Sequence, residues 1–414
     1  MKIRTSVLII GILIMAFLCC CRHVQKTDRD KALKEFRKQV DETLPAVVSL
    51  TGIQMSDPVK IEMLTRGELG KFFENTMEIE YPNGELRKRG QCFAEIGLLP
   101  QGYDLSAGFV KLLKEQAGAI YDQHSKTLKG VSDLPTEQKR AVNDRMIISH
   151  ELVHALQDRI IDIKKQSDAG LRNIDYEYAV RALLEGMASS VQLAYGQNLP
   201  YNKLPDVQSF WRSNLARATG GTLAQSPQYL TEYLISPYAE GGAFVQAWQK
   251  ANSGKTLKDL LGKIPASSEQ VLHFKKYVEA DEPTDIDLKH VHKILPKDWK
   301  LLYANILGEF DLLILFKMYK GTQNNAVELS TGWDGCRFEA YERKNGDRIL
   351  FGSSIWDSEK DANEFSNGFN TVLKESRTRG DYEVVQKKTM VNFVTGSSDG
   401  NQRSAILKSL SETH

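Results

Sequence analysis

The chain has 414 residues, of which 41% are hydrophobic, so it is long enough for two or three domains with apolar cores. Lysine and arginine (54) nearly balance aspartate and glutamate (53), which leaves a formal net charge of +1 at pH 7. This balance excludes a strongly basic protein of the nucleic-acid-binding type, and we expect no nucleic-acid partner.

Residues 1–21 have the pattern of a leader. A short basic segment precedes an apolar run at residues 7–18, which is too short to span a bilayer comfortably and suits a signal peptide. The run ends in three consecutive cysteines and resembles a bacterial lipoprotein signal in which Cys21 is acylated. We therefore expect a protein that is anchored in the membrane through the lipid on Cys21, with its body outside the cytoplasm. An uncleaved anchor is the alternative and gives the same location.

Residues 22–118 are expected to form an N-terminal accessory region, which could also be pro-like and inhibitory. Apolar residues at helical spacing follow residues 30–44, where Pro45 is expected to stop the helix. A strand is predicted at 59–64, and helices at 66–73 and 105–117. The region shows no recognisable chemistry.

Two cysteines lie in the body of the chain, Cys92 and Cys336, and they match no metal or redox spacing. A disulfide between them is permitted in an oxidising compartment, and two free thiols are equally compatible with the sequence.

A hairpin is predicted at residues 119–131, with a solvated His124 at its turn, and a helix is predicted at 135–163. This helix carries His150 and His154 on one face, four residues apart, where both imidazoles can bind one metal ion. Glu151 between them can act as the general base that polarises a metal-bound water. The pattern HExxH in an apolar helix therefore predicts a zinc centre. The alternative is a buried histidine pair that is satisfied by hydrogen bonds.

A catalytic zinc needs a third protein ligand. The next long helical pattern covers residues 175–195, and Glu185 lies in its apolar middle, which metal coordination would explain. We therefore predict one Zn²⁺ per chain, bound by His150, His154 and Glu185.

Three other residues offer alternatives to Glu185 as the third ligand or to its role in metal binding. Asp175 and Glu177 are rival ligands, although they lie near a helix start, where carboxylates are favoured in any case. A salt bridge to Arg181, one turn away, is the alternative role for Glu185.

Hydrolysis through a tetrahedral intermediate needs a hydrogen-bond donor to the developing oxyanion. Tyr238 and His273 are the candidates for this catalytic role. For Tyr238 the alternative is a packed aromatic ring, and for His273 it is a hydrogen bond that fixes a loop. His290 and His292 lie in a basic, polar stretch and are expected to be solvated.

The sequence pattern of the C-terminal part predicts a small α+β module at residues 321–414. A strongly apolar helix at 305–319 is expected to close the core of the preceding domain. The module itself should contain a hairpin around Asn345-Gly346, a helix at 358–373, and strands at 382–385 and 391–394.

The motif and the following glutamate resemble the gluzincin clan, the thermolysin-like metallopeptidases. The spacing from His154 to Glu185 is longer than in thermolysin, and Ser189 occupies the place of the usual second-shell aspartate. Asp158 is then the candidate that orients the histidines. The chain is more similar to a bacterial family of predicted secreted or lipoprotein zinc metallopeptidases, through the runs at 150–158 and 183–186 and the blocks at 237–241, 269–273 and 332–335.

The resemblance implies an α+β fold, predominantly α, with a zincin-like catalytic domain at residues 119–320 between the two accessory parts. The expected function is a zinc metallopeptidase that cleaves peptide or protein substrates. Two alternatives stay open: a non-catalytic lipoprotein that binds zinc or peptides, and a metal-assisted hydrolase of a non-peptide amide.

Overall fold

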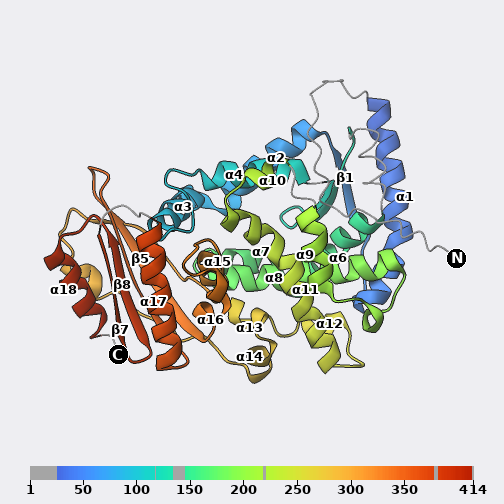
Figure 1. Cartoon of the computed structure of the whole chain (residues 1–414). Coiled ribbons are helices and arrows are strands. Elements are labelled where there is room, and N and C mark those ends of the chain that lie inside the picture. The colour runs from blue at the N-terminus through green and yellow to red at the C-terminus, as the bar shows by residue number, and fades with distance from the viewer. Residues whose placement is uncertain (1–25, 117, 134–144, 218–220, 377–380, 413–414) are drawn as a thin grey trace.

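The computed structural model describes residues 26–116, 118–133, 145–217, 221–376 and 381–412. Helices outweigh strands, and the strands form two separate sheets, so the predicted α+β class with predominant helix is confirmed (Figure 1). Within these ranges, no helix combines the length and apolar character that a membrane crossing requires. The predicted signal segment at 1–21 lies outside the described residues.

The N-terminal part packs four helices around a small sheet: α1 (Lys26–Thr51), α2 (Arg66–Glu80), α3 (Glu85–Glu95) and α4 (Leu105–Gln116). The prediction that Pro45 ends the first helix is wrong, because α1 continues through it to Thr51. Pro45 is exposed, so water can satisfy the carbonyl that it leaves without a partner, while Val40 and Val47 on either side are buried.

The small sheet has the strand order β1-β3-β2, with β1 (Lys60–Leu64), β2 (Ala119–Asp122) and β3 (Thr127–Val131). Strands β2 and β3 form the predicted antiparallel hairpin, and β1 pairs parallel to β3. Because β1 comes from the expected accessory region and the hairpin from the expected catalytic domain, one sheet joins the two parts. Strand β2 is an edge of this sheet.

The helical body is built on three long helices: α6 (Arg145–Ile161), α8 (Ile174–Gln197) and α11 (Gln228–Ala251). Helix α8 packs between the other two. Shorter helices surround them: α7 (Ile163–Gly170), α9 (Val207–Arg217), α10 (Gly221–Gln225), α12 (Leu257–Leu260), α13 (Ser268–Leu272) and α14 (Phe274–Glu279). The first residues of the predicted motif helix, 135–144, lie outside the described residues.

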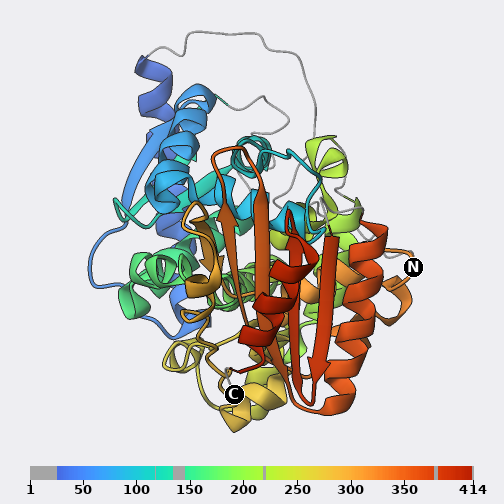
Figure 2. The ribbon, with the colours of Figure 1, turned by 90° about the vertical axis from the view of Figure 1, so that its left-hand side faces the viewer.

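The C-terminal sheet has the order β4-β5-β6-β8-β7, and all its neighbours are antiparallel. Its strands are β4 (Lys300–Asn305), β5 (Trp333–Glu342), β6 (Arg348–Trp356), β7 (Asp381–Lys387) and β8 (Met390–Gly396). Helix α17 (Glu359–Glu375) covers the face toward the helical body, and α18 (Gly400–Leu410) crosses the opposite face (Figures 1 and 2). The predicted hairpin, helix and strands are therefore present.

The predicted helix at 305–319 is wrong at its start. Residues up to Asn305 belong to strand β4, and helix α15 (Glu309–Lys317) begins only after Gly308, whose backbone N–H donates to the Asp311 carboxylate. The C-terminal sheet thus takes its edge strand from before residue 321. Helix α16 (Ala326–Ser330) connects α15 to β5.

One hydrophobic core extends through most of the chain, from Phe36 in α1 to Phe393 in β8. A second, smaller cluster lies between the outer face of the C-terminal sheet and α18. Cys92 and Cys336 are buried free thiols, so the disulfide is not formed. Burial raises the pKa of the Cys336 thiol to about 12, which keeps it protonated and unreactive.

Candidate metal centre

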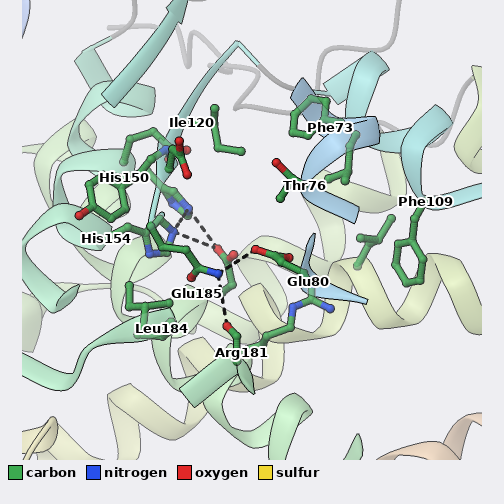
Figure 3. A pocket seen from close by; sticks show the side chains of 18 of the residues that line it. Phe73, Thr76, Glu80, Phe109, Ile120, His150, His154, Arg181, Leu184 and Glu185 are labelled. Atoms are coloured by element: carbon green, nitrogen blue, oxygen red, sulfur yellow. Dashed lines mark hydrogen bonds and ion pairs between the residues drawn. The ribbon is translucent and has the colours of Figure 1, made fainter. Parts of the chain in front are cut away.

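Three predicted ligands converge on one point of the structure. His150 and His154 extend from α6 and Glu185 from α8, and one ligand atom from each lies within 4.8 Å of the others (Figure 3). The Nε2 atoms of the two histidines are 3.2 Å apart, and Glu185 Oε2 lies 3.1 Å from His150 Nε2 and 3.6 Å from His154 Nε2. Two imidazoles and a carboxylate at this separation fit a zinc ion with an open fourth position.

Two glutamine side chains orient the histidines. Gln192 Oε1 lies 3.2 Å from His150 Nδ1, and Gln157 Oε1 lies 2.9 Å from His154 Nδ1. Gln157 is held in turn because its amide donates to the Leu184 carbonyl at 3.0 Å. An acceptor at Nδ1 fixes the proton there and leaves Nε2 free to bind a metal, as second-shell partners do.

The prediction that Asp158 orients the histidines is wrong. The Asp158 carboxylate accepts hydrogen bonds from the Tyr121 hydroxyl at 2.8 Å and from the Ile163 backbone at 2.8 Å, so it ties α6 to β2 and to the start of α7. Sequence reasoning missed both glutamines. Gln192 offered a signal, because it is a polar residue only 4% exposed in an apolar helix, seven residues after Glu185 and hence on the same face.

Glu151 points to the edge of strand β2. Its Oε2 accepts a hydrogen bond from the Tyr121 backbone N–H at 2.7 Å. Burial raises the pKa of Glu151, while the positive charge of His150 and His154 opposes the increase. A carboxylate with a raised pKa next to a metal position is suited to accept and return a proton.

Glu185 and His154 form an ion pair, with Glu185 Oε2 3.6 Å from His154 Nε2. Burial opposes ionisation, but attraction to His154 and hydrogen bonds from both histidines hold the pKa of Glu185 well below its ordinary value. Burial likewise disfavours charged His154, yet Glu185 raises its pKa to about 9. A cation bound here would replace the histidine proton as the partner of the carboxylate.

Tyr238 lies at the candidate centre, the position that a role as oxyanion donor requires. Its ring is nearly parallel to the His150 ring, with centroids 5.6 Å apart and an angle of 17°. Its hydroxyl is hydrogen-bonded to Glu185, and burial raises its pKa well above the ordinary value, so the phenol keeps its proton. Ser189 links α8 to α11, because its hydroxyl forms hydrogen bonds with the carbonyls of Gly186 on α8 and Tyr238 on α11.

His273 does not lie at the centre. Its Nε2 is 2.7 Å from Glu309 Oε1, and it is absent from the residues that line the cavity around the metal centre. The short loop after α13 directs the imidazole toward α15 instead. The prediction of an oxyanion donor at His273 is therefore wrong, and the alternative of a hydrogen bond that fixes a loop describes the contact.

The rival ligands are also occupied elsewhere. Asp175 accepts from the Ser268 backbone N–H at 2.9 Å, and Glu177 is paired with Arg89 at 2.8 Å. His124, expected to be solvated, is partly buried with its Nε2 3.3 Å from Glu80 Oε1.

The candidate metal centre opens into a cavity of about 410 Å³. Helices α6, α7, α8, α9 and α11 and strand β2 contribute to its wall, and the N-terminal helices α2 and α4 form another part of it (Figure 3). The N-terminal wall is mainly apolar and includes Phe72, Phe73, Met77, Phe109 and Leu113. The accessory region, in which the sequence showed no chemistry, therefore shapes the space next to the metal ligands.

Residues 301–406 match a family model described as a domain of unknown function (DUF8575). This segment contains the C-terminal sheet and leaves the metal centre outside it. No curated protein matches the chain. Among solved structures, the chain is similar to one described as "a putative hydrolase with a novel fold" from Chloroflexus aurantiacus, with 14% identity, a TM-score of 0.38, and coverage of 63% of this chain and 93% of that chain. A TM-score of 0.38 does not establish a shared fold.

Proposed function

We propose that the chain is a zinc-dependent hydrolase of peptide bonds. The observation that carries the proposal is the convergence of His150, His154 and Glu185 next to Glu151, at the end of a cavity of ligand size. A structural zinc site normally closes its fourth position with a protein ligand and needs no general base. The donor set and the adjacent carboxylate therefore favour catalysis over a structural metal.

A zinc ion bound by these three residues would supply a Lewis acid that lowers the pKa of water and polarises a carbonyl. The residues of the chain move the protons. Glu151 takes the proton of the attacking water and passes it to the leaving amine. Tyr238, which keeps its phenolic proton, can donate a hydrogen bond to the oxygen on which negative charge develops.

Strand β2 supports a peptide as the substrate. Its Tyr121 N–H points to Glu151, which shows that the free edge of the strand faces the centre. Backbone groups two residues apart point to the same edge, so Ala119 offers its N–H and C=O on this side as well. An extended peptide could pair with this edge by β-augmentation and place its carbonyl at the metal position.

The leader at residues 1–21 supports a location on the outer side of a membrane, with the lipid on Cys21 as the anchor. We propose that the enzyme acts there on peptide or protein substrates.

Metal analysis and peptide hydrolysis test the proposed function together. We expect about one zinc per purified chain, and a loss of zinc in His150→Ala and in Glu185→Ala. Glu151→Gln should keep the zinc and lose about 10²- to 10⁴-fold in hydrolysis of a peptide library, because the general base is removed. A parent chain without bound metal after zinc is supplied, or a Glu151→Gln variant with full activity, would overturn the proposal.

A further inference from the structure

One face of α8 presents three charged side chains to the cavity, at a spacing of four residues: Glu177, Arg181 and Glu185. The two carboxylates have partners. Glu185 belongs to the metal centre, and Glu177 pairs with Arg89 at 2.8 Å and accepts hydrogen bonds from the hydroxyls of Tyr81 and Tyr233.

Arg181 has no such charge partner. Its guanidinium lies over the ring of Tyr233, 4.3 Å from the centroid, and it forms no ion pair with any residue in the described part of the chain. Glu80 also lines the cavity, but its carboxylate is taken by the Gln123 amide at 2.8 Å and by His124. The Glu185 carboxylate attracts Arg181 from one turn away, but in the proposed centre that charge belongs to the metal ion, so Arg181 keeps no counter-ion of its own. A cation held inside a cavity in this way is costly unless a ligand supplies the negative charge.

The short distance between Arg181 and the proposed metal centre would allow Arg181 to bind a charged group of the substrate. Arg181 precedes Glu185 by one helical turn, so their Cα atoms are about 6 Å apart along the helix axis. A carboxylate on the residue that follows the cleaved bond lies only a few bonds beyond the reacting carbonyl. The planar guanidinium can bind such a carboxylate through two parallel hydrogen bonds.

We propose that Arg181 binds a carboxylate of the substrate and thereby selects peptides that are cleaved next to their C-terminal residue. This inference rests on the proposed function and names the substrate class of the same centre. The cavity of about 410 Å³ matches a short peptide, and its apolar wall at Phe73 and Phe109 suits the side chain of that residue. The same wall favours a terminal carboxylate over an acidic side chain as the source of the charge.

The test compares matched peptides on the full chain. The first pair has an apolar C-terminal residue as the free acid or as the amide. The second pair is amidated and ends in glutamate or glutamine. Hydrolysis is followed for the parent, and binding is measured by calorimetry on the zinc-loaded Glu151→Gln variant and on the parent with and without zinc. Arg181→Met removes the charge, and Arg181→Lys keeps the charge without the two-pronged geometry. Arg403→Met, which breaks the Asp381 pair on α18 far from the cavity lining, is the matched control.

We expect the free acid to be preferred over its amide by at least tenfold in the parent and in Arg403→Met. The ratio should fall to about one in Arg181→Met and fall severalfold in Arg181→Lys. A preference confined to the glutamate peptide would move the site from the terminal to the side-chain carboxylate and overturn the terminal assignment. Equal treatment of acid and amide by the parent, or a preference that survives Arg181→Met, would overturn the inference.

Failure of the proposed function gives a different result. If the parent cleaves neither peptide, calorimetry still shows whether the carboxylate is preferred and whether Arg181 carries the preference. If Arg181→Met does not fold, the preference for the free acid over the amide in the parent, and its decrease in Arg181→Lys, still test the inference.

Discussion

The backbones of Gly186 and Gly241 touch where α8 crosses α11. A Cβ atom added to Gly186 would lie 2.2 Å from the carbonyl carbon of Gly241, and one added to Gly241 would lie 2.0 Å from the carbonyl oxygen of Ala182. Gly186 is the neighbour of Glu185, and Gly241 lies one turn after Tyr238. The close crossing therefore brings Tyr238 against Glu185.

Gly241→Ala should separate the two helices, because backbone atoms occupy the space that the methyl group needs. We expect the free energy of unfolding to fall by about 1–3 kcal/mol, as for overpacked interiors, and zinc affinity to fall with it. Urea denaturation and zinc titration measure the two effects. Gly67→Ala on α2 meets only an ordinary contact with the Thr65 hydroxyl, so it should leave zinc affinity unchanged and keep or slightly raise the free energy of unfolding. A Gly241→Ala variant as stable as the parent would contradict the role of this crossing.

Gln157→Leu removes the hydrogen-bond acceptor of His154 at nearly constant volume. Loss of a second-shell partner typically lowers metal affinity about 10- to 100-fold, and we expect a decrease of this size, measured by competition with a chromogenic chelator. Gln246→Leu, at a partly exposed position of α11 where the amide donates to the Pro205 carbonyl, serves as the control. Unchanged affinity in Gln157→Leu would mean that the imidazole is oriented by packing alone.

The convergence of His150, His154 and Glu185 on one point could be predicted because the information behind it is local. Four-residue spacing on a helix fixes His150 and His154 on one face, and a carboxylate in the apolar middle of the next helix identified Glu185. The orientation of the histidines was predicted wrongly, because Asp158 and Gln157 are sequence neighbours and only the packing of α6 against β2 and α8 decides which one faces an imidazole.

Long-range contacts account for the other errors. The pairing of β4 with β5 keeps the chain extended up to Asn305, and the cap at Gly308 starts α15 only at Glu309. The sequence of the segment does not reveal its strand partner, so its helix was predicted to start too early. The role of α2 and α4 as a cavity wall likewise arises from tertiary packing. His273 had the right residue type for catalysis, but the direction of its loop toward Glu309 could not be read from the sequence.

The buried pair of Arg89 and Glu177 joins the N-terminal part to α8, with Arg89 only 2% exposed. Arg89→Met should lower the free energy of unfolding by about 3–5 kcal/mol, because it leaves the Glu177 charge buried without its cation. Lys164→Met breaks a surface pair with Asp168, whose side chains are 47% and 57% exposed, and should cost less than about 1 kcal/mol. Equal effects of the two substitutions in urea denaturation would show that the buried pair contributes nothing beyond a surface contact.

Asp175 should make the protein less stable as the pH rises. It is 1% exposed, and burial raises its pKa from about 3.8 to about 7. Below pH 4 the carboxyl is protonated in both the folded and the unfolded chain, so its contribution is fully present. Between pH 4 and 7 the unfolded chain loses this proton while the folded chain keeps it, and stability decreases by an amount of order 4 kcal/mol.

Asp175→Asn keeps an oxygen acceptor for the Ser268 backbone N–H and cannot ionise, so it should remove this part of the pH dependence. Urea denaturation at pH 4, 6 and 8 checks the difference between variant and parent, which should increase with pH. Asp57→Asn is the control of opposite sign, because hydrogen bonds from Arg159 and Ser56 lower the pKa of exposed Asp57 and its small contribution is lost as the pH falls. If the parent and Asp175→Asn lose the same stability between pH 4 and 8, Asp175 is not protonated in the folded chain, and the buried position near Ser268 must hold a carboxylate instead.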